Sequence, residues 1–164
     1  MKTIQDKQNE IITVLEEDCV GQSLTLKSLS HCTVDLQGVI GALYIYSCTN
    51  CLIKAVFVKS ACNIYKCTDS SVELVSQQMR INESNNMKFS ILTRSDPALV
   101  ESENAVFQRL PLTPVHKRLL GDLYDAFAES QAWRNVQDFQ SLNGTIKNFT
   151  ILEYFVLRLY LVYI

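Results

Sequence analysis

The sequence predicts a mainly β fold, a right-handed parallel β-helix of about five coils followed by a helical segment. Three observations lead to this prediction: an internal repeat between residues 23 and 75, a short alternation of apolar and polar residues within each repeat, and a helical pattern after residue 113. The chain has 164 residues, of which 48% are hydrophobic and 20% are charged. This composition fits one globular domain, or a domain with a short appendage.

The repeat has a period of about 19 residues. Five sets of equivalent positions keep this period: Leu24, Leu43 and Cys62; Leu26, Ile45 and Ile64; Leu29, Cys48 and Cys67; Cys32, Cys51 and Ser70; Val34, Ile53 and Val72. Alternations such as Leu24-Thr25-Leu26 are typical of a strand with one buried face. Short strands that recur at this period stack as a coil with about 4.8 Å between turns, so equivalent side chains form ladders.

The repeat also accounts for the six cysteines, which are Cys19, Cys32, Cys48, Cys51, Cys62 and Cys67. Cys48 and Cys51 have the spacing of a zinc or redox motif, but no second such pair accompanies them. We therefore expect reduced thiols that pack as small apolar side chains in the ladders. We expect no metal site and no cofactor.

Two further coils follow with looser spacing, in which Asn86 and Asn104 continue the series from Ser70 and the register shifts by about three residues. The fourth coil contains VSQQMRINES, residues 75–84. Alternation predicts that Met79 and Ile81 point into the core, which leaves Gln78 and Arg80 on the outer wall and Gln77 at a corner.

The pattern becomes helical after two prolines. Apolar residues at helical spacing predict a helix over residues 114–129 that covers the coil or caps its end: Val115, Leu119, Leu120, Leu123 and Phe127. The next apolar anchors are Trp133, Val136, Phe139 and Leu142. We expect a lead-in at 1–17, the β-helix at 18–112, a helix and packing segment of the same domain at 113–142, and an apolar tail at 143–164. This tail fits an added strand, an interaction surface or an atypical chain end.

Charge and terminal composition restrict the function classes. The net charge of −2 and the pI of 5.7 give no reason to expect nucleic-acid binding. The N-terminal residues lack a secretory or myristoylation signal, which favours the cytoplasm. The apolar run 149–164 is short for a membrane span and is interrupted by Glu153 and Arg158. We expect a monomer.

Four motifs now resemble a known family: L-x-L-x-x-L-x-x-C-x-V at residues 24–34, QQMRI at 77–81, DPALVE at 96–101 and W-x-x-V-x-D-F-x-x-L at 133–142. They resemble the C-terminal domain of tubulin-binding cofactor C over residues 18–142, with QQ-x-R as the most specific element. The chain is more distantly similar to the retinitis pigmentosa 2 protein and to cyclase-associated protein, which share the β-helix.

The resemblance implies a function and a set of site residues. In this family the QQ-x-R arginine is an arginine finger that stimulates GTP hydrolysis by a partner. Carried over, Arg80 is the finger, Gln77 and Gln78 flank it at the nucleotide interface, and Glu101 and Phe139 are partner-binding residues. The chain then activates a GTPase in trans and is not itself an enzyme, since no nucleotide-binding loop or nucleophile and base pair is visible.

The partner that the resemblance implies is tubulin, with tubulin cofactors D and E, in cytoplasmic tubulin folding at the microtubule cytoskeleton. One alternative is an Arf-like small GTPase, and another is a non-catalytic module that binds tubulin or actin. A purely structural interpretation of Arg80 pairs it with Glu73 or Glu83 on a nearby coil. The chain departs from the family at Asn82 and over residues 107–110, and it lacks the helical N-terminal domain of cofactor C.

Overall fold

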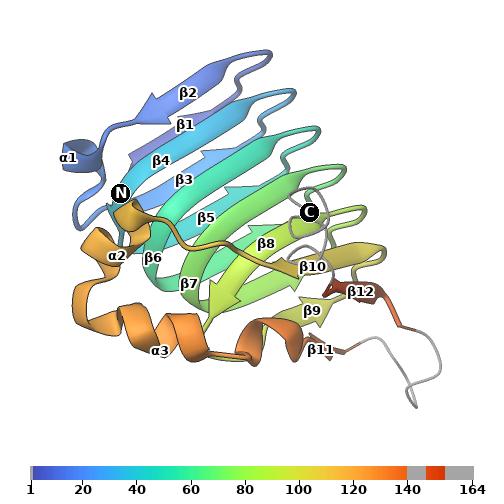
Figure 1. Ribbon diagram of the computed structural model, residues 1–164. Helices are drawn as coiled ribbons and strands as arrows, with labels where there is room; N and C mark the ends of the chain where they lie inside the picture. Colours follow the sequence, from blue (N-terminus) through green and yellow to red (C-terminus); the bar gives the residue numbers. More distant parts are fainter. Residues whose placement is uncertain (1, 140–146, 154–164) are drawn as a thin grey trace, which may run out of the picture.

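The computed structural model of the protein, described here for residues 2–139 and 147–153, is a stack of short parallel strands (Figure 1). The strands are β1 (Lys2–Gln5), β2 (Ile11–Val14), β3 (Ser23–Lys27), β4 (Thr33–Ile40), β5 (Ala42–Tyr46), β6 (Leu52–Tyr65), β7 (Ser71–Asn82), β8 (Lys88–Thr93), β9 (Ala98–Val100), β10 (Ala105–Arg109), β11 (Gln137–Asp138) and β12 (Phe149–Leu152). The helices are α1 (Glu16–Cys19), α2 (Pro114–Leu120) and α3 (Tyr124–Glu129), with 3-10 turns η1 (Gly121–Leu123) and η2 (Ala132–Arg134).

Each coil of the stack contributes to two parallel sheets. Sheet A contains β2, β4, the first halves of β6 and β7, and then β8, β10 and β12. Sheet B contains β1, β3, β5, the second halves of β6 and β7, and then β9 and β11. The strands form a β-solenoid of about six turns, which confirms the predicted fold class.

The predicted ladders are the observed strand register. Leu24 pairs with Leu43 and Leu43 with Cys62 in sheet B, while Val34 pairs with Ile53 and Ile53 with Val72 in sheet A. These inward side chains are almost fully buried. All six cysteines are free and buried, which confirms that they pack as core side chains.

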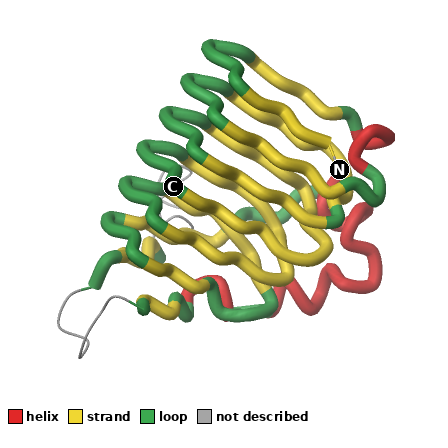
Figure 2. Tube along the Cα trace, turned by 180° about the vertical axis from the view of Figure 1, so that it is seen from behind, coloured by secondary structure: helices red, strands yellow, loops and turns green. Residues whose placement is uncertain are grey.

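One edge of the stack is a ladder of turns, seen opposite the helices in Figure 2. Each turn holds two residues in the left-handed conformation, three positions apart, such as Ser28 and His31 or Glu83 and Asn86. Their backbone amides donate to carbonyls of the next coil, as from His31 to Thr49 at 3.1 Å. The positions are mostly polar and include Asn and Asp, which tolerate this conformation better than β-branched residues. The turns therefore satisfy the backbone where the chain leaves the strands.

The first coil is one that the sequence does not predict. The predicted lead-in at 1–17 contains β1 and β2, which pair with β3 and β4. At the turn, this coil carries Lys7 and Glu10 at the positions that hold Leu29 and Cys32 one coil later. Because the turn of this coil carries charged residues where later coils carry Leu29 and Cys32, the apolar repeat is not visible there.

The register of the later coils also differs in detail from the prediction. Ser71 pairs with Lys88, so Asn86 and Asn104 follow Asp69 in the turn ladder and not Ser70. The shift is two residues rather than three. Within β6 and β7 it accumulates at bulges, because Ala55 pairs with Leu74, 19 residues later, and Ala61 pairs with Gln78, 17 residues later. The last step of this contraction falls between Ser76 and Gln78, at the start of the QQMR stretch.

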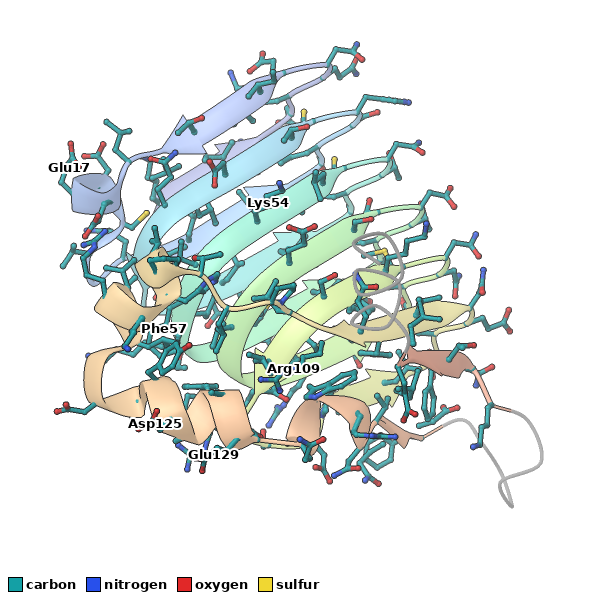
Figure 3. The ribbon with its side chains drawn as sticks, in the orientation of Figure 1. Glu17, Lys54, Phe57, Arg109, Asp125 and Glu129 are labelled. Atoms are coloured by element: carbon teal, nitrogen blue, oxygen red, sulfur yellow. The ribbon has the colours of Figure 1, made fainter. Side chains whose placement is uncertain are left out.

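The predicted helix over 114–129 is divided. Thr113 caps α2 in a capping box with His116, and Gly121, with φ of 54°, ends it before η1 and α3. The helices lie along the bends of the coils, opposite the turns (Figure 2). Phe127 of α3 packs edge-on against Phe57 with ring centroids 5.6 Å apart, and Figure 3 shows Phe57 directed toward this helix. Val115, predicted to be buried, is 43% exposed.

The C-terminal segment begins as a strand. Phe149–Leu152 adds to β10 in parallel, which supports the added-strand interpretation for these residues. The remaining apolar residues, 154–164, and the predicted anchor Leu142 lie outside the described residues. Over the part of the chain that the structure describes, no helix has the length and apolar character that a membrane crossing requires.

Candidate functional site

The bend of β7 fixes the backbone just before Arg80. The buried Ser76 hydroxyl donates to the carbonyl of Gln78 at 2.7 Å and lies 3.3 Å from the carbonyl of Ser60. The Gln77 carbonyl accepts from the amide of Ser95 at 3.1 Å and from its hydroxyl at 3.1 Å. Gln77 therefore lies at the corner, as predicted, with its main chain held by the following coil.

The second half of β7 presents a row of polar side chains outward. Gln78 and Arg80 are exposed, and Asn82 is partly exposed. Met79 and Ile81 between them are 1% and 0% exposed, which confirms the predicted alternation. Successive outward residues of a strand are about 6.6 Å apart, so the row spans about 13 Å of sheet B.

Arg80 has small or polar neighbours on the adjacent coils. It pairs in register with Asn63 on β6 and with Ala98 on β9. Because Ala98 ends at its Cβ, its side chain cannot reach over the guanidinium. Among the described residues, Arg80 forms no hydrogen bond or ion pair.

The carboxylates that a structural interpretation assigned to Arg80 have other partners. Glu73 lies 3.9 Å from the ammonium of Lys54, and Glu83 lies 3.9 Å from that of Lys66. Glu73 also belongs to the sheet A half of β7, on a different face from Arg80. Within residues 2–139 and 147–153, therefore, no carboxylate forms an ion pair with Arg80.

An apolar row lies beside the polar one. Val100 pairs with Asn82, and the Phe139 amide donates to the Leu99 carbonyl at 3.0 Å, which places Phe139 beside Val100. Phe139 is 67% exposed. It follows β11, whose Gln137 pairs with Ala98, so Phe139 shares the outer face of sheet B with Arg80, two strands away. The structure thus brings these two predicted residues to one face.

Glu101 has a different position. It occupies the turn ladder in the left-handed conformation, with φ of 49°, one coil after Glu83. Its side chain is exposed at the edge of sheet B. Its backbone role is that of a turn residue, so it borders the polar row without belonging to it.

Two residues of the site, Ser76 and Ala98, are not among those that the sequence predicts. Ser76, which is fully buried, positions the bend, and Ala98 leaves Arg80 uncovered. The only indication of Ser76 in the sequence is that it is a small polar residue directly before QQMR, where the chain turns a tight corner. No cluster of three or more His, Cys, Asp or Glu side chains suited to a metal ion occurs within residues 2–139 and 147–153.

Comparison with known families now adds to this geometry. The family model described as tubulin binding cofactor C matches residues 21–139. The chain belongs to the tubulin binding cofactor C family. All five predicted site residues, which are Gln77, Gln78, Arg80, Glu101 and Phe139, fall inside the matched span.

Solved structures give a weaker comparison than the family model. The tubulin binding cofactor C from Leishmania major is 14% identical to this chain, with a TM-score of 0.49, over 91% of this chain and 85% of that one. No match is found among curated proteins.

Family membership also locates the departures seen in the sequence. Asn82, the first departure from the family resemblance, is the third residue of the polar row on sheet B. Phe107, which begins the divergent run at 107–110, is 0% exposed and stacks on Phe89 with centroids 4.9 Å apart. The first departure therefore lies on the candidate site, and the second begins in the core.

Proposed function

We propose that this chain is a GTPase-activating domain that supplies Arg80 as an arginine finger to the GTP of tubulin during tubulin folding and heterodimer assembly. Membership of the tubulin binding cofactor C family supports a role in tubulin folding. The GTP would be bound by the partner, so the chain would act in trans, in the cytoplasm and in association with the cytoskeleton. Gln77, Gln78, Glu101 and Phe139 would contact the partner around Arg80.

One observation carries the proposal. Arg80 is exposed on an outer sheet face without a partner among the described residues, while the nearby carboxylates Glu73 and Glu83 are paired with lysines. The intrachain ion pair that a purely structural interpretation requires for Arg80 is therefore not formed among the described residues. Arg80 is instead left free to meet a negative charge from outside.

The chemistry explains why an arginine is suited to this position. Hydrolysis of GTP spreads negative charge over the γ-phosphate oxygens and the bridge to the β-phosphate. A guanidinium is planar, permanently charged and able to donate two parallel hydrogen bonds to these oxygens. A finger supplied in trans increases the rate by about 10³–10⁵, equivalent to roughly 4–7 kcal/mol of transition-state stabilisation.

The rest of the bend would prepare Arg80 for this task. The Ser76 hydroxyl and the contacts to the Gln77 carbonyl hold the main chain, so the direction in which Arg80 leaves the sheet is set before the partner arrives. The side-chain amides of Gln77 and Gln78 cannot act as bases. They are suited to hydrogen-bond the partner at the nucleotide interface.

The test is the GTP hydrolysis rate of tubulin with tubulin cofactors D and E present. We expect Arg80→Ala to abolish the stimulation, a loss of about 10³-fold or more, while binding to tubulin is roughly retained. Arg80→Lys should restore little, because an ammonium lacks the planar fork. Lys88→Ala, which removes an exposed cation from sheet A, is the matched control and should leave stimulation unchanged. Unchanged stimulation in Arg80→Ala would refute the finger assignment.

The same assay separates the alternatives. If the chain stimulates an Arf-like small GTPase but not tubulin, and Arg80→Ala removes that stimulation, the chemistry stands and the partner changes. If neither GTPase is stimulated but tubulin or actin binds, the chain is a non-catalytic module. A pure binding module has no need of the QQ-x-R motif.

A further inference from the structure

The outer face of sheet B carries a shallow groove beside the polar row, with a volume of about 680 Å³. We call it the tyrosine groove. Its lining residues are Lys27, Tyr44, Tyr46, Ser47, Asn63, Tyr65, Lys66 and Asn82. None of them belongs to the residues that the sequence predicts for the site.

The groove crosses the strands and ends at the polar row. One of its columns runs from Lys27 through Tyr46 and Tyr65 to Asn82, each paired with the next in register. Asn82 is two residues after Arg80 on the same strand. The parallel column pairs Tyr44 with Asn63, and Asn63 with Arg80. The groove is therefore continuous with the site proposed above.

Tyrosine rings form the floor of the groove. The rings of Tyr44 and Tyr46 lie 6.1 Å apart, and that of Tyr46 meets Tyr65 edge-on at 6.4 Å. Tyr65 is 40% exposed, which is high for a large apolar side chain on a sheet. Rigid aromatic rings with one polar atom are typical of protein interfaces, because they offer contact area at a low cost in side-chain entropy.

The charge of the groove is positive although the chain has a net charge of −2. Lys27 and Lys66 line it, and no lining residue carries a carboxylate. The Lys66 ammonium lies over the Tyr65 ring at 5.1 Å from its centroid and 3.9 Å from Glu83 outside the groove. Lys27 has no ion pair within the described residues. Two coils separate the strand positions of Lys27 and Tyr65, so the two ammonium groups lie on the order of 10 Å apart.

We propose that the tyrosine groove binds an acidic, extended segment of the GTP-binding partner, and so positions that partner over Arg80. Lys27 is unpaired among the described residues, and the exposed 3.9 Å contact between Lys66 and Glu83 is a weak one that a ligand can replace. Charge complementarity with these lysines selects carboxylates, about three positions apart in an extended peptide. Tyrosine rings and hydroxyls then contact the peptide between these residues. The proposal rests on the proposed function for the identity of the partner, but the residues that line the groove do not include Arg80.

The first experiment measures binding alone. A fluorescein-labelled polyglutamate peptide is titrated with the protein, with polyglutamine as the neutral comparison. We expect only polyglutamate to bind, with affinity reduced about fivefold or more by Lys27→Glu or Tyr65→Ser and reduced less by Arg80→Ala, which lies beside the groove. Lys88→Glu makes the same charge change on an exposed strand lysine of sheet A, and should leave the affinity unchanged.

The second experiment locates the effect in the GTPase assay. Lys27→Glu should raise the protein concentration needed for half-maximal stimulation by about fivefold while the maximal rate stays as in the wild type. Arg80→Ala should lower the maximal rate instead. If Arg80→Ala has no effect on hydrolysis, the finger proposal fails while the peptide titration still decides the groove.

Three results of the titration would overturn the groove assignment. Equal weakening by Lys88→Glu and Lys27→Glu would mean unspecific attraction to net charge. Equal binding of polyglutamine would remove the role of the carboxylates. Tighter binding of oligodeoxythymidine at the same tyrosines would assign the groove to single-stranded nucleic acid, whose bases also stack on aromatic rings. Circular dichroism of each variant confirms that the coil is intact.

Discussion

Truncation to alanine should have different effects at two phenylalanines of this chain: it should lower stability at Phe107 and weaken tubulin binding at Phe139. Phe107 is 0% exposed and stacks on Phe89 at 4.9 Å, with Phe149 edge-on at 6.2 Å. Phe139 is 67% exposed on the outer face of sheet B. Phe107→Ala therefore leaves a cavity in the aromatic ladder, whereas Phe139→Ala removes a ring that contacts mainly solvent.

The magnitudes follow from these environments. A buried Phe→Ala replacement costs about 3–5 kcal/mol of unfolding free energy, and loss of two ring pairs places Phe107→Ala in the upper half of that range. For a domain of this size the melting temperature should fall by roughly 8–20 °C. Phe139→Ala should change the unfolding free energy by about 0.5 kcal/mol or less, while it weakens binding to tubulin.

The assay is urea unfolding of the wild type, Phe107→Ala and Phe139→Ala, followed by circular dichroism. Tubulin binding is then measured for the wild type and Phe139→Ala. The transition midpoint should move for Phe107→Ala with an unchanged slope. If Phe139→Ala costs more than about 1 kcal/mol of unfolding free energy, its ring is a core group and its assignment as a partner-binding residue is wrong. Tubulin binding unchanged in Phe139→Ala would equally remove that assignment.

Three further predictions concern the scaffold. A Cβ on Gly38 would lie 2.7 Å from the Glu16 carbonyl oxygen, so Gly38→Ala should cost about 1–3 kcal/mol in urea unfolding, whereas Gly41→Ala, with its nearest contact at 3.4 Å, should cost little. Burial raises the pKa of the Cys62 thiol and all six cysteines are buried, so iodoacetamide should label them only in unfolding urea; rapid labelling of the native protein would contradict the ladder packing. Burial lowers the pKa of His116 below 6.5, so the unfolded chain binds this proton more readily than the folded chain. The free energy of unfolding should therefore fall as the pH drops through about 6.5. If the dependence of stability on pH is equally steep in His116→Gln, this residue is not its cause.

The repeat between residues 23 and 75 predicted the parts of the fold where one side chain stacks on its equivalent. Leu24, Leu43 and Cys62 are such a set, and their register is observed. The prediction failed where side chains of successive coils are not alike or not at the same spacing. These places are the first coil, and the fourth coil, where bulges shorten the period from 19 to 17 residues. Bulges depend on how two neighbouring strands bend together, which a single period does not express.

The candidate site shows the same division. Alternation alone placed Met79 inward and Arg80 outward, because side chains of a strand point to opposite faces. Alternation could not identify the residues beside Arg80 on other coils, such as Ala98 and Asn63. It also could not show that Glu73 and Glu83 form ion pairs with lysines. Those neighbours decide whether the guanidinium is free.

By itself, then, the sequence determined the strand period, the buried ladders and the outward direction of Gln78 and Arg80, since each follows from spacing along one strand or from one repeat to the next. Only the tertiary structure decided which side chains share the face of Arg80. Phe139 reaches that face after the helical insertion between β10 and β11, and the tyrosine groove joins residues from four strands. Such contacts depend on how successive coils stack and on where the chain re-enters the sheet. The spacing of residues along one strand determines neither of these.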